Sequence, residues 1–197
     1  MVLHTVTVCA APAKPPPASS NLTLTLVQTV QQTTVTGEAF GPVGTGCTPS
    51  GGPSCTFLSV QYSANGKTTP FGPFTATGSE TISFLDALGT FVTPSGAVDP
   101  ITGNRTGICA PQFGTDEMTF SDGSTLSDNF QGTVCCGAAD CSSVGFLGPP
   151  FVNHNASIIT GGTGRFAGAH GAGMSTSSTD STGNVSIGTG QTVLGLP

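Results

Sequence analysis

Apolar and polar residues alternate along most of the chain after residue 20. In the stretch NLTLTLVQTV, Leu22, Leu24 and Leu26 fall on one face of an extended chain, and Asn and Thr residues fall on the other. The stretches 74–84 and 125–134 repeat this period of two. Apolar residues at helical spacing with caps are close to absent. The pattern predicts an all-β protein whose strands each bury one face.

Glycines within these strands bear on the shape of the expected sheet. A glycine inside a strand weakens it unless it allows a bulge or a sharp bend, so many such glycines favour a curved, closed sheet over a flat sandwich. Turn signals at 65–67 (NGK) and 121–124 (SDGS) separate the runs. We expect a single antiparallel closed β-barrel of about eight strands. Two long insertions with cysteines and prolines, residues 85–112 and 135–150, break the regular spacing.

A proline-rich segment divides the chain. Residues 1–19 are interpreted as an N-terminal strand or leader remnant with a proline-rich linker, and residues 20–197 as the barrel domain. The opening residues do not make a standard signal peptide, because their apolar run is short and no basic residues precede it.

The composition narrows the class of protein further. Only 7% of residues are charged, yet 36% are hydrophobic and twelve are phenylalanine, which favours a packed core over disorder. A net charge of −6 with four basic residues argues against nucleic-acid binding, which needs a basic surface. No stretch approaches the roughly 20 apolar residues of a membrane helix, so no membrane span is expected.

The seven cysteines indicate disulfides rather than a metal centre. Paired CxxC spacing is missing and the chain has three histidines, so a zinc site would lack ligands and we expect no metal. Cys47 and Cys55 bracket a turn-rich stretch and form the likeliest local bridge. Cys9 is interpreted as the odd cysteine, either free or paired between chains. Cys109 is expected to pair with one of three cysteines crowded into one loop, Cys135, Cys136 and Cys141.

A disulfide framework also predicts a compartment. Disulfides persist in oxidising environments, so we expect a secreted, extracellular protein. Sequons support a glycoprotein. The four candidate glycosylation sites are Asn21, Asn104, Asn155 and Asn184.

The glycine-rich stretch ITGGTGRFAGAHGAG has two interpretations. Its GxGxxxG spacing follows an apolar run, as in a dinucleotide-binding loop, but the residues that follow make no amphipathic helix and a βαβ unit does not fit. We therefore expect Gly161, Gly162 and Gly164 to form a tight structural turn between antiparallel strands. Phe166 and His170 would then share a face of the second strand.

Three stretches together resemble one family. The string ITGGTGRFAGAHGAG, preceded by FGPFTATGSETISF and FSDGSTLSDNFQGTV, is similar to the allene oxide cyclase/dirigent-like β-barrel superfamily, in particular its secreted bacterial members. The matches cover roughly residues 20–40, 68–84 and 117–192 in order. The resemblance implies an eight-stranded barrel with an apolar cavity open at one end. Members include cyclases and isomerases as well as relatives without known activity; no catalytic motif of the family can be placed on this chain.

Alternation itself supplies candidate catalytic residues. Glu80 is in phase with Phe74 and Phe84, and Asp128 with Leu126 and Phe130. If those faces line the barrel, burial raises the pKa of both carboxyls and suits them to acid/base chemistry. The alternatives are that a glycine bulge flips the phase, or that a buried carboxylate ties down a loop. His170 is the third candidate.

Other constellations are less well supported. Arg165 is out of phase with Phe166 and is expected at the rim, paired with a carboxylate. A Ser/His/Asp hydrolase lacks the GxSxG elbow. The acidic residues at 116, 117 and 122 lack the ligand rhythm of an EF-hand and read as a solvated turn.

Three functions stay open. The first is an extracellular binding or structural module that holds an apolar small molecule. The second is a cyclase or isomerase that needs no cofactor, in which Glu80 or Asp128 shuttles a proton. The third is a subunit of an extracellular filament or surface assembly, in which the N-terminal strand is donated to a like subunit.

Overall fold

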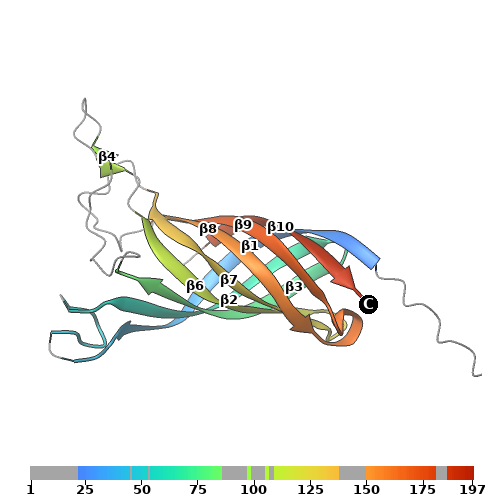
Figure 1. The fold of residues 1–197 in the computed structure, drawn as a ribbon, viewed down its shortest axis with the longest axis horizontal. Coiled ribbons are helices and arrows are strands. Elements are labelled where there is room, and N and C mark those ends of the chain that lie inside the picture. The colour runs from blue at the N-terminus through green and yellow to red at the C-terminus, as the bar shows by residue number, and fades with distance from the viewer. Residues whose placement is uncertain are drawn as a thin grey trace, which may run out of the picture.

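Eight long strands dominate the computed structural model of the chain (Figure 1). They are β1 (Leu22–Gly41), β2 (Phe57–Thr69), β3 (Gly72–Ser83), β6 (Cys109–Phe120), β7 (Thr125–Cys136), β8 (Phe151–Gly162), β9 (His170–Thr179) and β10 (Ser186–Leu196). A separate pair, β4 (Ala97–Val98) and β5 (Arg105–Thr106), and one short 3-10 helix, η1 (Gly164–Phe166), complete the elements. The structure describes residues 22–44, 46–52, 54–85, 97–98, 105–106, 109–137, 150–180 and 186–197.

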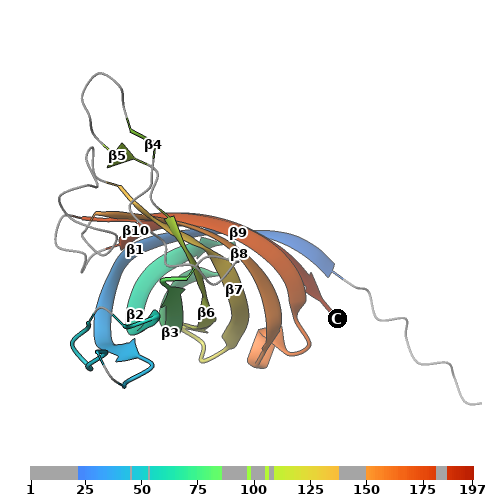
Figure 2. The ribbon, with the colours of Figure 1, turned by 60° about the vertical axis from the view of Figure 1, so that its left-hand side comes forward.

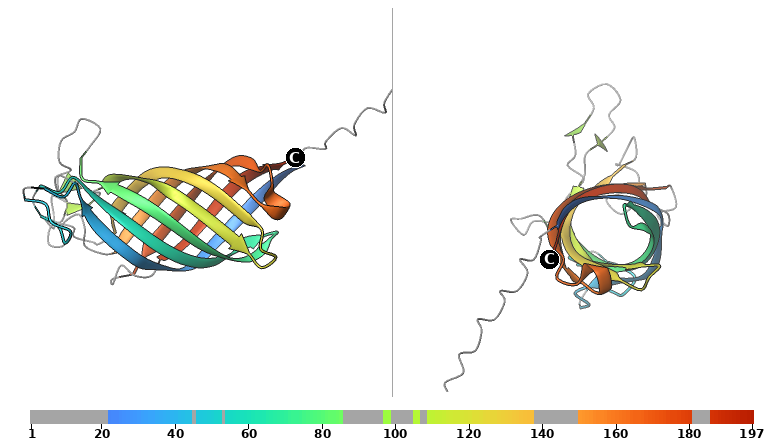
Figure 3. Two further views of the ribbon diagram at one scale, coloured as in Figure 1. Left: turned by 90° about the horizontal axis from the view of Figure 1, so that it is seen from below. Right: turned by 90° about the vertical axis from the view of Figure 1, so that its right-hand side faces the viewer.

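The eight strands form one closed antiparallel barrel. Its order is β1-β10-β9-β8-β7-β6-β3-β2, so each strand pairs with its neighbours in the chain, and β1 and β10 close the sheet. Figure 3 shows the resulting ring from its end, and Figure 2 shows β8, β9, β10 and β1 curving along one side. Closure gives every strand of the ring a paired neighbour on both sides. The predicted fold class, a barrel of about eight antiparallel strands, is confirmed.

The longest strand, β1, is shared between two partners. Its residues from Leu22 to Val30 pair with β10, and those from Val27 to Gly41 pair with β2. Register shifts after Val30 and after Val35 mark β-bulges in its pairing with β2. Bulges bend a strand and increase its twist, which lets β1 follow the curve of the barrel.

Strand alternation sends the predicted faces inward. Phe74, Ala76 and Ile82 of β3 are buried, as are Leu126 and Phe130 of β7. Their sequence neighbours on the opposite faces are mostly exposed or half-buried. Because the pleat alternates side chains, the phase predicted for both strands holds over their length.

One end of the barrel is closed by an aromatic floor. Phe166 of η1 is fully buried, 4.9 Å in ring-centroid distance from Phe71 and from Phe120. Figure 3 shows this helix as the short orange coil at the end where β9 begins. The floor cluster consists of Leu26, Phe74, Ala76, Met118, Phe120, Leu126, Ile159, Phe166, Ala169 and Leu194.

The glycine-rich connection differs from the tight turn predicted. The chain leaves β8 at Gly162, passes through η1 and enters β9 only at His170. Gly164, at a φ of 58°, and Gly168, at a φ of 76°, adopt a left-handed backbone that folds Phe166 back onto the floor. A Cβ on Gly162 would lie 2.7 Å from that of Phe166, so this glycine allows close packing.

The predicted turn at residues 65–67 is wrong as well. These residues lie within β2, and the β2–β3 turn falls at Pro70 and Phe71. A Cβ on Gly66 would come within 2.6 Å of the Phe74 ring, so the glycine makes room for an aromatic side chain in the sheet. The predicted turn at 121–124 is confirmed between β6 and β7.

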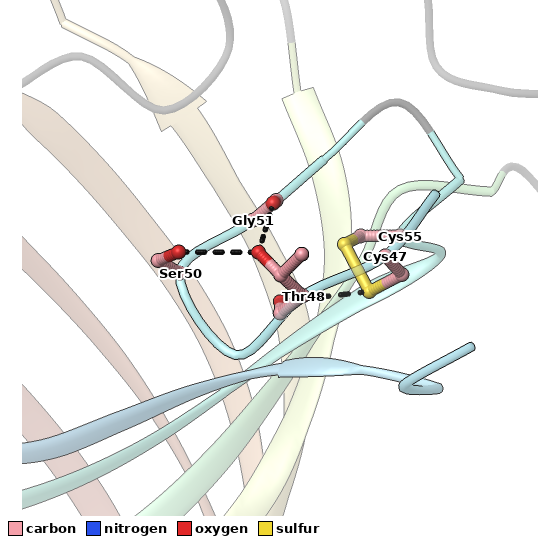
Figure 4. The surroundings of a disulfide bond; sticks show 5 residues. All are labelled: Cys47, Thr48, Ser50, Gly51 and Cys55. Carbon is pink, nitrogen blue, oxygen red and sulfur yellow. Dashed lines mark hydrogen bonds between the residues drawn. A yellow bond between two sulfur atoms is a disulfide. The ribbon is translucent and has the colours of Figure 1, made fainter. Parts of the chain in front are cut away.

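Disulfides lie at the opposite end from the floor. Cys47 and Cys55 are bridged in the β1–β2 connection, where Thr48 Oγ1 donates to the Gly51 carbonyl at 2.7 Å (Figure 4). Cys109 and Cys135 are bridged directly across β6 and β7. Both predicted bridges are confirmed, and Cys136 is disulfide-bonded too. These bonds indicate an oxidising environment. Cys9 and Cys141 lie outside the described residues.

The floor predicts a large effect of removing Phe166. We expect Phe166→Ala to lower the free energy of unfolding by about 3–5 kcal/mol, because it leaves a cavity among aromatic rings. Denaturant unfolding measures the loss. Phe113→Ala is the matched control: Phe113 is 55% exposed on β6, and its removal should cost less than about 1 kcal/mol. Equal losses in the two variants would contradict the role of the floor.

Candidate functional site

A cavity of about 290 Å³ lies inside the barrel. Phe74, Ala76 and Met118 of the floor cluster bound it on one side. Toward the disulfide end it is bounded by an upper cluster, made of Leu58, Val60, Ile82, Ala110 and Val134 with the partly buried Val35, Phe40, Phe84 and Phe151 packed against them. The cavity therefore lies between two apolar layers.

Four buried or half-buried ionisable side chains line the cavity between these layers, and a fifth, Glu38, is exposed. Tyr62 of β2, Glu80 of β3, Asp116 of β6 and Asp128 of β7 all contribute to its wall. Tyr62 pairs with Gly78, Gly78 with Asp116, and Asp116 with Asp128, so one row crosses four strands. Directly opposed residues in such a row have Cβ atoms about 4.5–5.5 Å apart. Glu80 lies two residues beyond Gly78 on the same face.

A glycine allows the row to form a contact across β3. The Tyr62 hydroxyl donates a short hydrogen bond to Asp116 Oδ1, although β3 lies between their strands. A Cβ on Gly78 would lie 2.5 Å from Tyr62 Cζ. The phenol ring therefore reaches Asp116 only because position 78 carries no side chain.

Burial and mutual repulsion raise the pKa values of the four ionisable side chains. Burial, together with the charge of Asp116, raises the pKa of Glu80 to about 7 and that of Asp128 to about 7. Burial also raises the pKa of Asp116, while the hydrogen bond from Tyr62 opposes that rise. Burial and the nearby carboxylates raise the pKa of Tyr62 far above its usual range, so its hydroxyl acts as a donor. Near neutral pH, Glu80 and Asp128 are therefore partly protonated.

Asp128 is left with an unused acceptor. Its side chain is 8% exposed, and its Oδ1 atom has no hydrogen-bond partner. The other such atom among the described side chains is Oε1 of Gln112, whose Nε2 donates to Asn155 Oδ1 at 2.7 Å. Buried acceptors without a partner cost about 1–3 kcal/mol, so Asp128 favours a protonated state or a donor from a ligand.

The opposite wall is neutral and polar. It carries short hydroxyl and amide side chains, and Asn153 Nδ2 donates to Ser177 Oγ at 3.1 Å there. The cavity thus has an acidic wall and a hydroxyl wall, with apolar layers on either side. The main contributors to the hydroxyl wall are Gln28, Asn153, Asn155, Ser157, Ser175, Ser177, Thr179, Thr189 and Thr192.

The structure brings together two of the three predicted catalytic residues. Glu80 and Asp128 line the same cavity. His170 is exposed at the start of β9, and its ring lies against Gly195. Its expected phase with Phe166 was wrong, because Phe166 belongs to η1 and no continuous strand joins the two residues.

Sequence reasoning missed Asp116 and Tyr62. The expectation that Asp116 belongs to a solvated acidic turn is wrong: it points inward from the middle of β6, while Glu117 points outward. The alternation that placed Glu80 also runs through Gln112, Asp116 and Met118, and this signal was available. The pairing with Tyr62, 54 residues away, has no local signal.

Arg165 lies outside the cavity, against the floor. Its Nε atom is 3.5 Å from Asp122 Oδ2, and its guanidinium carbon lies 4.8 Å from the centre of the Phe120 ring. The expectation that it pairs with a carboxylate is confirmed. Cation–π contacts with Phe71 and Phe166 hold it over the same floor.

Several other expectations concern sites away from the acidic row. Asn155 is the described sequon residue, and it lines the cavity; Asn21, Asn104 and Asn184 lie outside the described residues, as do residues 1–19. In the described part of the chain, no three His, Cys, Asp or Glu side chains are grouped to hold a metal ion. No described helix is long and apolar enough to cross a membrane.

Comparisons of the chain with known proteins identify no relative. No protein-family model, no curated protein and no solved structure matches the chain. The candidate function therefore rests on the geometry of the cavity.

The raised pKa values predict a specific pH dependence of stability. Glu80 and Asp128 bind protons more tightly in the folded state than in the unfolded state. Their contribution to the free energy of unfolding is therefore fully present below about pH 4 and is lost as pH rises through about 7. We expect the free energy of unfolding to fall from about pH 5 to about pH 8, by about 2 kcal/mol for each carboxyl.

Denaturant unfolding across that range checks this expectation. The double variant Glu80→Gln/Asp128→Asn should lose most of the slope, whereas Glu117→Gln, which removes an outward carboxylate of β6, should keep it. A slope unchanged in the double variant would contradict the assignment.

Proposed function

We propose that this protein is a secreted, disulfide-stabilised barrel that binds a small, largely apolar molecule in its interior. The observation that carries the proposal is the cavity of about 290 Å³ held between two apolar clusters. Small-molecule pockets usually measure roughly 300–1,000 Å³ and combine apolar walls with a few converging polar groups. The cavity lies near the lower end of that range, so the ligand is small.

The disulfides support the extracellular part of the proposal. They fasten the β1–β2 connection and the β6–β7 ladder at the end opposite the floor. A cross-linked rim keeps the cavity preformed, which lowers the cost of ordering on binding.

Tyr62 provides a direct assay for binding. It is the single tyrosine of a chain without tryptophan, so the near-ultraviolet signal of tyrosine reports on the cavity wall alone. We expect small apolar alcohols, such as 1-adamantanol, to change Tyr62 emission in a saturable manner.

A matched pair of variants tests the location of binding. Ala64→Leu fills the cavity from β2 and should weaken binding by at least about tenfold, because the larger side chain takes up much of a small pocket. Ala172→Leu makes the same change on the exposed outer face of β9 and should leave binding unchanged. Equal affinities in both variants, or no saturable change in the wild type, would contradict the proposal.

A second candidate function is a cofactor-free cyclase or isomerase, the activity that the resemblance to allene oxide cyclase and dirigent-like barrels implies. The observation that favours it is the meeting of the Tyr62–Asp116 pair with Glu80 and Asp128 in one cavity. In such a reaction one of the two carboxyls, Glu80 or Asp128, removes a proton from carbon as a carboxylate, and the other donates a hydrogen bond to the developing oxyanion as a carboxylic acid. The first carboxyl then returns the proton at a second carbon.

A simple proton-transfer substrate tests this candidate. We expect the protein to convert cyclohex-3-enone to its conjugated isomer faster than buffer, and Glu80→Gln/Asp128→Asn to lower that rate by about 10²-fold or more. Proton NMR follows the reaction. Glu117→Gln should match the wild type. A rate equal in the wild type and the double variant would reject catalysis and leave binding as the function.

A further inference from the structure

The charges that face the cavity are all of one sign. The ionisable groups on its wall are Glu38, Tyr62, Glu80, Asp116 and Asp128. Among the described residues that line it, none is Lys, Arg or His. Buried carboxylates in proteins are ordinarily paired with a cation, because taking an unpaired charge out of water is costly. The described part of the chain supplies no such partner to this wall.

One carboxylate of the row also lacks a hydrogen-bond donor. Asp128 is more than nine-tenths buried and lines the cavity, and its Oδ1 atom has no hydrogen-bond partner. Its neighbour in the row, Asp116, accepts from Tyr62. A donor placed in the cavity would complete the row at Asp128.

We propose that the cavity binds an amphipathic amine whose ammonium group donates to Asp128 within the acidic row and whose apolar body packs against the upper and floor clusters. This inference rests on the proposed binding function and names the chemical class of its ligand. An ammonium group has three donors and no acceptor, which matches a wall of carboxylates faced by hydroxyl and amide oxygens. A neutral ligand would leave the acidic row without a counter-charge.

Binding of an amine is coupled to protons. Tyr62, Glu80 and Asp116 face Asp128 in the same cavity, and the cation favours ionised carboxylates while protons compete with it. The affinity for the amine should therefore increase from about pH 5 to about pH 8, by up to tenfold per pH unit for each proton released. The affinity for a neutral ligand of the same shape should not increase with pH in this way.

Two probes of nearly equal shape separate these cases. Titration of the full chain with 1-adamantanamine and 1-adamantanol, followed by calorimetry and by Tyr62 emission, compares an ammonium with a hydroxyl on one apolar body. We expect the amine to bind at least about tenfold more tightly at about pH 8, because its charge-assisted hydrogen bond forms in a buried site. The preference should shrink toward about pH 5.

Variants locate the effect. Asp128→Asn keeps the size of the side chain and removes its charge, so the amine should lose at least about tenfold in affinity while the alcohol changes little. Glu80→Gln should weaken the amine in the same direction, and it provides a second test should Asp128→Asn fail to fold. Glu117→Gln is the control on the outer face and should leave both probes unchanged.

The outcomes distinguish the amine assignment from the proposed function, which is binding of a small molecule in the cavity. Equal binding of the two probes, an amine preference that survives in both Asp128→Asn and Glu80→Gln, or amine affinity that falls as pH rises would overturn the amine assignment and leave cavity binding intact. If neither probe changes Tyr62 emission, the proposed binding function fails, and the inference fails with it.

Discussion

Closure of the sheet through the β1–β10 pairing is the constraint on which the structure depends. Once β1 pairs with both β10 and β2, one face of every strand must occupy the interior. The strands β2, β3, β6 and β7 send large side chains inward, but β9 and β10 offer mainly glycine, serine and threonine there. These short side chains cannot fill the space opposite, so the middle of the barrel stays open as a cavity.

The same closure places carboxylates where water is scarce. Glu80, Asp116 and Asp128 cannot turn outward without reversing the phase of their strands and exposing the apolar residues beside them. Their repulsion opposes folding when they are ionised, and protonation relieves it. Such a row lowers the stability of the fold at neutral pH, and strongly perturbed carboxyls of this kind are common at functional sites.

Several strand glycines in this barrel leave room for neighbouring aromatic side chains. Gly66, Gly78 and Gly114 each lie in a strand interior where a Cβ would meet a ring, from Phe74, Tyr62 and Phe130 respectively. Strand glycines covered by neighbouring aromatic rings are a recognised device in curved sheets. At Gly78 the device has a chemical consequence, because it lets the phenol reach Asp116. The high glycine content thus reflects close packing within strands as well as turns.

Features that depend on local geometry are predictable from the sequence. The period of two predicted the inward faces that carry Glu80 and Asp128, and the short spacing of Cys47 and Cys55 predicted their bridge. Both follow from the pleat and from chain length, which act over a few residues. The barrel class followed from the same alternation and from the strand glycines.

Features that depend on strand register and on backbone direction emerge only when the whole barrel is assembled. The contact of Tyr62 with Asp116 joins strands on either side of β3 and needs the pairing of three strands. The exposure of His170 and the burial of Phe166 depend on η1, whose left-handed glycines turn the chain back in a way that alternation cannot anticipate. Likewise, residues 65–67 have the composition of a turn but extend as strand, because cross-strand pairing and the Phe74 ring outweigh local preference.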